Sequence, residues 1–291
     1  MSSASQSIEF SWEPAEFDAL VRSCLLDDGV QLALSCLPDR NARILEAGCG
    51  SGRVVKHLHD LGYRRVEGVE LNQAAVSWVN RQFPELRIVS GDLLNMPYED
   101  GCFDAVLSFG VVEHFRKGLD EPLRSLWRVL KSGGVAVVTV PSFNMLRRAG
   151  RIWKQFRQQM DPRCNAMIRR IRKKAPPPPN PEEQGPYHVY LDGGRFFEYR
   201  LRPREFEQCC RKAGFKILRS VPISHIDGFY HSFGPKLIRF ENWAFYPTRT
   251  ARILNATFKR ISFFHNHMHA CVLTKPSPSE MTPSVFVAQS N

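Results

Sequence analysis

The sequence lacks the features that mark membrane-spanning and secreted proteins. No apolar run approaches the roughly 18 residues that a membrane-spanning helix needs. Residues 1–14 contain neither a basic region nor an apolar region, so we expect no secretory signal. Eight cysteines occur, but none stands in a C-x-x-C pair and their spacing is scattered. We therefore expect reduced thiols in a cytoplasmic protein, and neither a zinc site nor a disulfide framework.

Length and composition indicate a folded protein with a substantial core. The chain has 291 residues, of which 43% are hydrophobic and 24% are charged. This composition excludes disordered and collagen-like chains, and the sequence contains no internal repeat. The length suits one large domain or a domain with sizeable insertions.

Positive charge is concentrated in one segment. The chain carries 40 Lys and Arg residues against 29 Asp and Glu residues, a net charge of +11. Residues 1–144 hold 14 basic and 19 acidic side chains, whereas residues 145–174 hold eleven basic side chains and a single acidic one. A protein that binds nucleic acid over its whole surface is therefore disfavoured, and the basic segment becomes the candidate contact surface.

Strand and helix patterns alternate through the first 141 residues. Short apolar runs predict strands, and apolar residues at helical spacing predict helices. The expected strands are 43–47, 65–71, 86–92, 103–110 and 135–141, and the expected helices are 14–36, 54–62, 72–83 and 120–131. Such alternation implies an α/β fold with a doubly wound, mostly parallel sheet, whose ligands lie beyond the carboxyl ends of the strands.

The regular alternation ends at Ser142, after which long insertions separate the remaining core elements. Insertions of this length are often substrate lids or docking elements. We expect, in chain order, an N-terminal helical cap (1–41), a Rossmann-like core (42–141), a basic, proline-containing insertion (142–196), a helix and sixth strand (197–223), an aromatic and basic insertion (224–266), a final strand (267–276) and a flexible tail (277–291).

A glycine-rich loop follows the first expected strand, in ILEAGCGSGR (44–53). Glycines here would let the backbone approach a ligand closely at the start of a helix. A dinucleotide fingerprint needs a third glycine where Arg53 stands, and a triphosphate loop needs G-K-[ST], which is absent. Glu46 would repel a pyrophosphate but attract a cationic amino group. The loop therefore predicts a positively charged ligand without phosphates, although an ordinary strand-to-helix turn stays an alternative.

This loop resembles motif I, E-x-G-x-G-x-G, of class I S-adenosylmethionine-dependent methyltransferases, and further motifs similar to that family follow in order. They are GVELN (68–72), SGDLLNMPY (90–98), FDAVLSFGVVEHF (103–115) and RVLKSGGVAVVTVP (128–141). The resemblance implies a seven-stranded sheet with S-adenosylmethionine as cofactor, Glu70 at the ribose hydroxyls, Asp92 near the adenine amino group and Leu93 beside the ring. The cofactor-binding residues that it implies are Glu46, Gly48, Cys49, Gly50, Gly52, Glu70, Leu71, Asp92, Leu93 and Phe109.

Structural roles stay open for the acidic residues of these motifs. Glu46 could pair with a nearby arginine, Glu70 could be a surface carboxylate at a strand end, and Asp92 could cap a turn. Cys49 is expected to provide a small side chain and no thiol chemistry.

His114 and Glu113, just past the fourth strand, are the predicted catalytic residues. A hydroxyl or amine acceptor must lose a proton, and an imidazole has a pKa suited to accept it. The family often carries a similar Glu-His pair. The alternative is that both residues only brace the loop.

The other histidines carry weaker signals. His265, His267 and His269 alternate, so on a strand they would share one face. They could bind a metal there, but we expect them on the solvent side of the strand and predict no metal. His225 and His231, which flank aromatic residues, are candidates for lining a pocket.

The resemblance implies a methyltransferase for a small-molecule acceptor, with O-methylation of a sugar, lipid-linked glycan, quinone or secondary metabolite as the expected reaction. One alternative is an RNA methyltransferase that uses 145–174 for phosphate contacts, although no N-P-P-Y/F-like motif follows the fourth strand. A non-catalytic, cofactor-binding interaction protein is another. The basic segment could be solvated, contact an anionic membrane surface or lipid-linked substrate, or contact RNA. We expect a cytoplasmic protein, with attachment to the inner membrane surface open, and the oligomeric state is not indicated.

Overall fold

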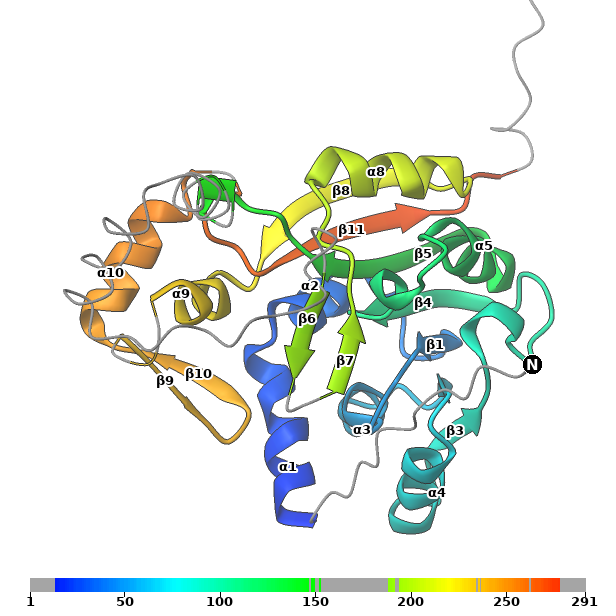
Figure 1. Ribbon diagram of the computed structural model, residues 1–291. Coiled ribbons are helices and arrows are strands. Elements are labelled where there is room, and N and C mark those ends of the chain that lie inside the picture. The colour runs from blue at the N-terminus through cyan, green and yellow to red at the C-terminus, as the bar shows by residue number, and fades with distance from the viewer. Residues whose placement is uncertain are drawn as a thin grey trace, which may run out of the picture.

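The computed structural model describes residues 14–146, 148, 149, 152, 188–191, 194–233, 235, 237–261 and 263–277. Seven strands form the central sheet in the order β3-β2-β1-β4-β5-β11-β8 (Figure 1). They are β1 (Ile44–Ala47), β2 (Val66–Glu70), β3 (Arg87–Ser90), β4 (Phe103–Phe109), β5 (Leu130–Pro141), β8 (Lys216–Ile223) and β11 (Met268–Thr274). The strands β1 to β5 are parallel to one another, and β11 is antiparallel to both β5 and β8. The predicted doubly wound, mostly parallel sheet is confirmed.

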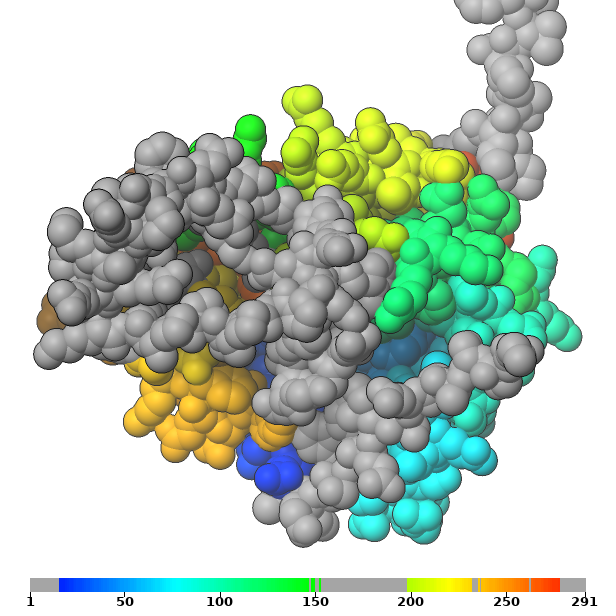
Figure 2. Space-filling view, in the orientation of Figure 1, coloured from blue at the N-terminus to red at the C-terminus, as the bar shows by residue number. Residues whose placement is uncertain are grey.

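Helices cover both faces of this sheet. One face carries α5 (Asp120–Val129) and α8 (Pro203–Lys212), which pack beside each other (Figure 1, Figure 2). The other face carries α2 (Asp28–Leu34), α3 (Arg53–Asp60) and α4 (Gln73–Gln82), and α1 (Pro14–Ser23) packs against α3. Each helix presents an apolar stripe to the sheet, as Leu123 and Leu126 of α5 illustrate with full burial.

Local sequence signals account for most helix boundaries. The Asp27 side chain accepts hydrogen bonds from Gly29 N and Val30 N, and it thereby begins α2 after the short 3₁₀ helix η1 (Cys24–Leu26). Asn72 begins α4 in the same way, as predicted. The predicted helix end at 131 and strand start at 135 are wrong, because β5 already begins at Leu130, which pairs with Phe103.

The predicted insertion 224–266 contains regular structure that the sequence patterns did not show. It holds α9 (His225–Phe233), the hairpin β9 (Ile238–Glu241) and β10 (Ala244–Pro247), and α10 (Arg249–Phe258). Phe229 of α9, Ile238 of β9 and Ala251 of α10 form a small core of their own. These elements pack together beside the end of β8 and the start of β11 (Figure 1). A second hairpin, β6 (His188–Leu191) and β7 (Gly194–Phe197), stands apart from the sheet.

Several predictions lie outside the described residues. They include most of the basic segment 145–174, the proline run 176–179, residues 1–13 of the cap and residues 278–291 of the tail. Within the described part of the chain, no helix combines the length and apolar composition needed to cross a bilayer.

Candidate active site

The glycine loop between β1 and α3 uses backbone conformations that only glycine adopts readily. Gly48, Gly50 and Gly52 have φ angles of 78°, 54° and 74°. A Cβ on Gly48 would lie 2.6 Å from the Val111 side chain, and one on Gly52 would lie 2.4 Å from Cδ1 of Ile88. A Cβ on Gly50 would meet nothing within 4 Å. Gly48 and Gly52 therefore serve packing, whereas Gly50 leaves open space beside the loop.

Glu70 lies at the carboxyl end of β2 and holds the glycine loop. Its Oε2 accepts a hydrogen bond from Gly50 N at 2.8 Å, and its Oε1 accepts one from Asn72 N at 2.9 Å. Each carboxylate oxygen keeps a lone pair for a further donor. The next residue, Leu71, is 63% exposed. Glu70 is thus fixed at the strand end where a ligand hydroxyl could reach it.

Glu46 is buried beneath the same loop. Only 4% of the residue is exposed, and its Oε2 has no hydrogen-bond partner within the described residues. Burial raises the pKa of this carboxyl to about 8, against a smaller lowering by the Arg53 guanidinium. Arg53 itself pairs with Asp27 at 2.6 Å, so the alternative of a direct Glu46–arginine ion pair is not seen. A buried carboxyl with an unsatisfied oxygen fits a cationic ligand group.

Cys49 turns its side chain away from the open side of the loop. It is 5% exposed, and a Cβ on Gly68 would lie 2.7 Å from its Sγ. Burial raises the pKa of its thiol well above the ordinary value. Cys49 can therefore offer a ligand only its backbone.

Asp92 and Leu93 follow β3 at the same edge of the sheet. The Asp92 side chain accepts a hydrogen bond from Leu94 N at 2.9 Å and begins the 3₁₀ helix η2 (Leu93–Asn95), so it does cap a turn. Leu93 is 6% exposed and belongs to the core, whereas Leu94 is 39% exposed. Contact of Asp92 and Leu93 with an adenine ring stays a prediction. Of the two leucines, Leu94 is the one whose exposed side chain could contact a ligand.

His114 and Glu113 lie in the 3₁₀ helix η3 (Val112–His114) after β4. The Glu113 side chain is 2% exposed, and burial raises its pKa well above the ordinary value. His114 is 28% exposed, and its Nε2 lies 3.1 Å from the Gly110 carbonyl oxygen and 3.8 Å from Glu113 Oε1. Because a carbonyl oxygen only accepts, Nε2 is the donor in the contact with Gly110. Glu113 is buried beside His114, and catalysis by either residue stays a prediction.

A cavity of about 680 Å³ opens beside the glycine loop. Arg53 of the loop, Phe109 at the end of β4 and Thr139 of β5 form its sheet side. Asp227 of α9, His267 and the β9–β10 hairpin form the opposite wall. Sequence patterns did not reveal this wall, because its residues lie more than 100 positions from the loop.

The structure corrects one prediction about histidines. His265 and His269 are fully buried and not on the solvent side. His265 Nε2 lies 2.7 Å from Asn255 Oδ1, and burial lowers its pKa to about 4. His269 Nε2 lies 3.1 Å from Ser220 Oγ. Neither His225 nor His231 lines the cavity, whose wall in α9 is formed by Ile226 and Asp227.

Comparisons with known proteins agree with this fold. A family model described as a methyltransferase domain matches residues 45–138. A "probable S-adenosylmethionine-dependent methyltransferase" of Mycolicibacterium smegmatis is 35% identical over 99 residues, 34% of this chain and 38% of that protein. Phthiotriol/phenolphthiotriol dimycocerosates methyltransferase 1 of Mycobacterium ulcerans is 35% identical over 106 residues, 33% of this chain and 36% of that protein. The match thus spans little more than a third of these relatives.

Structural comparison extends the likeness of the fold beyond the matched segment. The structure of geranyl diphosphate methyltransferase in complex with S-adenosylmethionine matches with a TM-score of 0.52 at 14% identity, covering 92% of this chain and 94% of that chain. The unsatisfied Glu46 oxygen, the open space at Gly50 and the fixed Glu70 carboxylate fit this cofactor. Residues 45–138 are therefore similar to a methyltransferase domain, and the sheet has the fold of class I S-adenosylmethionine-dependent methyltransferases.

Proposed function

We propose that the protein transfers the methyl group of S-adenosylmethionine to a hydroxyl of a small-molecule acceptor bound in the 680 Å³ cavity. The observation that carries this proposal is the position of the cavity, which is lined by Arg53, the first residue of α3 after the glycine loop, and by Phe109 of β4. A cavity of that volume suits a small molecule, for which pockets of about 300–1,000 Å³ are typical.

The cofactor would supply the activated methyl group and its leaving group. The chain's own residues must then align the acceptor and exclude water. They must also take up the acceptor's proton, a task for which His114 is the candidate. Gly110, whose carbonyl oxygen accepts the hydrogen bond from His114, directly follows the cavity residue Phe109 in the chain.

The cavity lining supports an acceptor with a polar group on a large apolar body. Phe109, Phe240, Trp243 and Phe245 provide aromatic surface, while Asp227 is among the few charged groups. The acceptor in the name of one relative, phthiotriol/phenolphthiotriol dimycocerosates methyltransferase 1, is in line with such an acceptor. A lipid-linked glycan, a quinone or an apolar secondary metabolite fits this lining better than a bare sugar.

Transfer of a labelled methyl group from S-adenosylmethionine into a fractionated lysate tests the proposal. We expect label in the small-molecule or lipid fraction, and a loss of that label with Trp243→Ala, which removes part of the cavity wall. Leu218→Ala is the matched control, because Leu218 is exposed on β8 and does not line the cavity. Label in RNA would support the alternative of an RNA acceptor contacted through 145–174. Bound cofactor without any labelled acceptor would support the non-catalytic alternative.

A further inference from the structure

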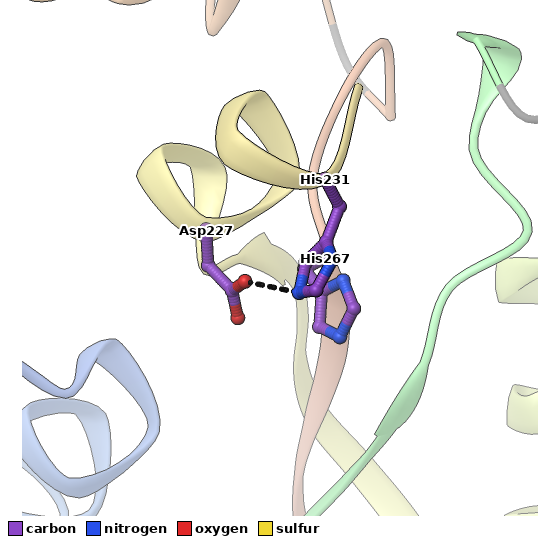
Figure 3. A group of neighbouring side chains, drawn as sticks. All are labelled: Asp227, His231 and His267. Atoms are coloured by element: carbon purple, nitrogen blue, oxygen red, sulfur yellow. Dashed lines mark ion pairs between the residues drawn. The ribbon is translucent and has the colours of Figure 1, made fainter. Parts of the chain in front are cut away.

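Three metal-ligating side chains come together outside the glycine loop. Asp227 and His231 lie one turn apart on α9, and His267 lies just before β11 (Figure 3). One ligand atom from each lies within 4.8 Å of the other two. His231 Nε2 is 3.0 Å from Asp227 Oδ1, and the rings of His231 and His267 lie with centroids 4.5 Å apart.

The backbone holds the two contributing segments in direct contact. A Cβ on Gly228 would lie 1.8 Å from the His265 carbonyl oxygen, so only glycine lets α9 approach this segment so closely. His267 N donates to the Ser224 carbonyl at 3.1 Å, and Ser142 N donates to the His267 carbonyl at 2.9 Å. The i,i+4 spacing then directs Asp227 and His231 to one face of the helix. The side-chain cluster is therefore built on fixed backbone.

We propose that Asp227, His231 and His267 bind one divalent transition-metal ion, with its remaining coordination positions directed to the cavity. Two imidazoles and a carboxylate are ligands suited to zinc, cobalt, manganese or iron. Around such an ion, neighbouring ligand atoms are separated by about 3.4 Å for tetrahedral bonds of about 2.1 Å. The observed separations need only small side-chain rotations, which the half-exposed His231 can make.

Charge around the cluster favours a cation. Asp227 and His267 line the cavity, so open coordination positions would face its interior. Asp27 and Asp28 line the same cavity, and Arg53 is the positively charged guanidinium among the lining residues. Arg53 is already paired with Asp27, which leaves the carboxylates of Asp28 and Asp227 in excess.

The site gives the cavity a chemical capacity that the glycine loop lacks. A metal ion with open positions can bind an acceptor oxygen and lower the pKa of a bound hydroxyl. This role toward the acceptor rests on the proposed function, whereas binding of the ion does not. The histidines predicted to alternate on a strand contribute only His267 to the cluster, and the other two ligands come from α9.

Metal titration of the untagged, chelator-treated full chain tests the proposal. We expect calorimetry with Zn²⁺ and Mn²⁺ to show one ion per chain, and Co²⁺ to give visible absorption bands of a nitrogen and oxygen site. Asp227→Asn, His231→Gln and His267→Gln should each weaken binding at least tenfold while keeping the melting temperature and the affinity for S-adenosylhomocysteine. His59→Gln on α3 is the matched control and should bind as the unchanged chain does.

Three outcomes would overturn the proposal. They are the absence of stoichiometric binding, equal loss with His59→Gln and His231→Gln, and a strong near-ultraviolet charge-transfer band that reports thiolate ligands. If one ion binds but no acceptor is ever methylated, the metal site stands and the proposed function fails. If methyl transfer proceeds unchanged after complete metal removal, the proposed role of the ion toward the acceptor is overturned.

Discussion

Glu46 combines full burial with a carboxyl pKa raised to about 8 from an ordinary 4.5. The folded chain keeps a proton there that the unfolded chain loses above pH 4.5. Stability contributed by this group is therefore greatest at low pH and is lost as pH rises to about 8. We expect Glu46→Gln to flatten that decline in the free energy of unfolding. Urea unfolding of the unchanged chain and of Glu46→Gln at pH 5.5 and pH 8, without cofactor, measures this decline. An equal decline in the two proteins would contradict a raised pKa at Glu46.

The same carboxyl predicts a pH dependence of cofactor binding. A cationic amino group beside Glu46 favours the ionised form, so binding below pH 8 must release a proton. We expect calorimetry with S-adenosylhomocysteine at pH 7, in two buffers of different ionisation enthalpy, to show release of up to about one proton. Glu46→Gln should bind more weakly and release none. A proton release that persists in the variant would assign it to another group.

Two glycines of the loop form a matched pair of variants. Gly52→Ala places a Cβ 2.4 Å from Ile88 at a φ of 74°, so we expect it to lower the free energy of unfolding by about 2–4 kcal/mol. Gly50→Ala should lower the free energy of unfolding by only about 1–2 kcal/mol, because its one cost is the left-handed conformation of an alanine. Its methyl group enters the open space beside the loop. It should therefore weaken S-adenosylhomocysteine binding at least tenfold. Chemical unfolding and calorimetry on both variants distinguish packing from ligand contact.

Among the elements, the β9–β10 hairpin is the place where a substitution should affect acceptor binding without affecting cofactor binding. Its turn residues Asn242 and Trp243 have φ angles of 49° and 61°, and Trp243 lines the cavity. Trp243→Gly suits this turn conformation but removes the indole from the wall. We expect KM for the acceptor to rise about tenfold, because the variant loses one apolar contact with the acceptor. The dissociation constant for S-adenosylhomocysteine should stay unchanged, and a parallel rise in both values would place Trp243 in the cofactor site.

The same hairpin shows why sequence patterns predicted some elements and missed others. The strands β1 to β5 are short apolar runs that end in glycine or polar clusters, and the helices between them have caps such as Asn72. The hairpin turn instead places a tryptophan in the left-handed region, where Asn-Gly is the recognisable signal. In the site, motif spacing indicated Glu46 and Glu70 because they lie near one loop. Asp227 and His267 come together only through tertiary packing, and the Asp227–His231 helical spacing was the one local signal.

For the molecule as a whole, the uneven charge predicts an anionic partner whose binding weakens as the salt concentration rises. Residues 1–144 are net acidic and most of the excess positive charge lies in 145–174, so we expect an anionic partner to contact this basic segment. We expect the full chain to co-float with vesicles that contain anionic lipid at low salt and to dissociate as salt rises. Replacing Arg169, Arg170, Arg172, Lys173 and Lys174 with glutamine should abolish flotation without changing cofactor affinity. Flotation that is equal on neutral vesicles would contradict an electrostatic contact, and retention of RNA under the same conditions would favour the nucleic-acid alternative.

The position of β11 in the sheet has a consequence for biosynthesis. This strand, formed by residues 268–274, fills the slot between β5 and β8 and pairs with both. Until it has left the ribosome, both neighbours present unpaired edges, and His267 and Met268 are absent from the cavity wall. The glycine loop and its parallel strands leave the ribosome much earlier, because the first 141 residues form them. Their core stays incomplete until β11 arrives, because Val272 and Leu273 pack against it from the two faces of the sheet.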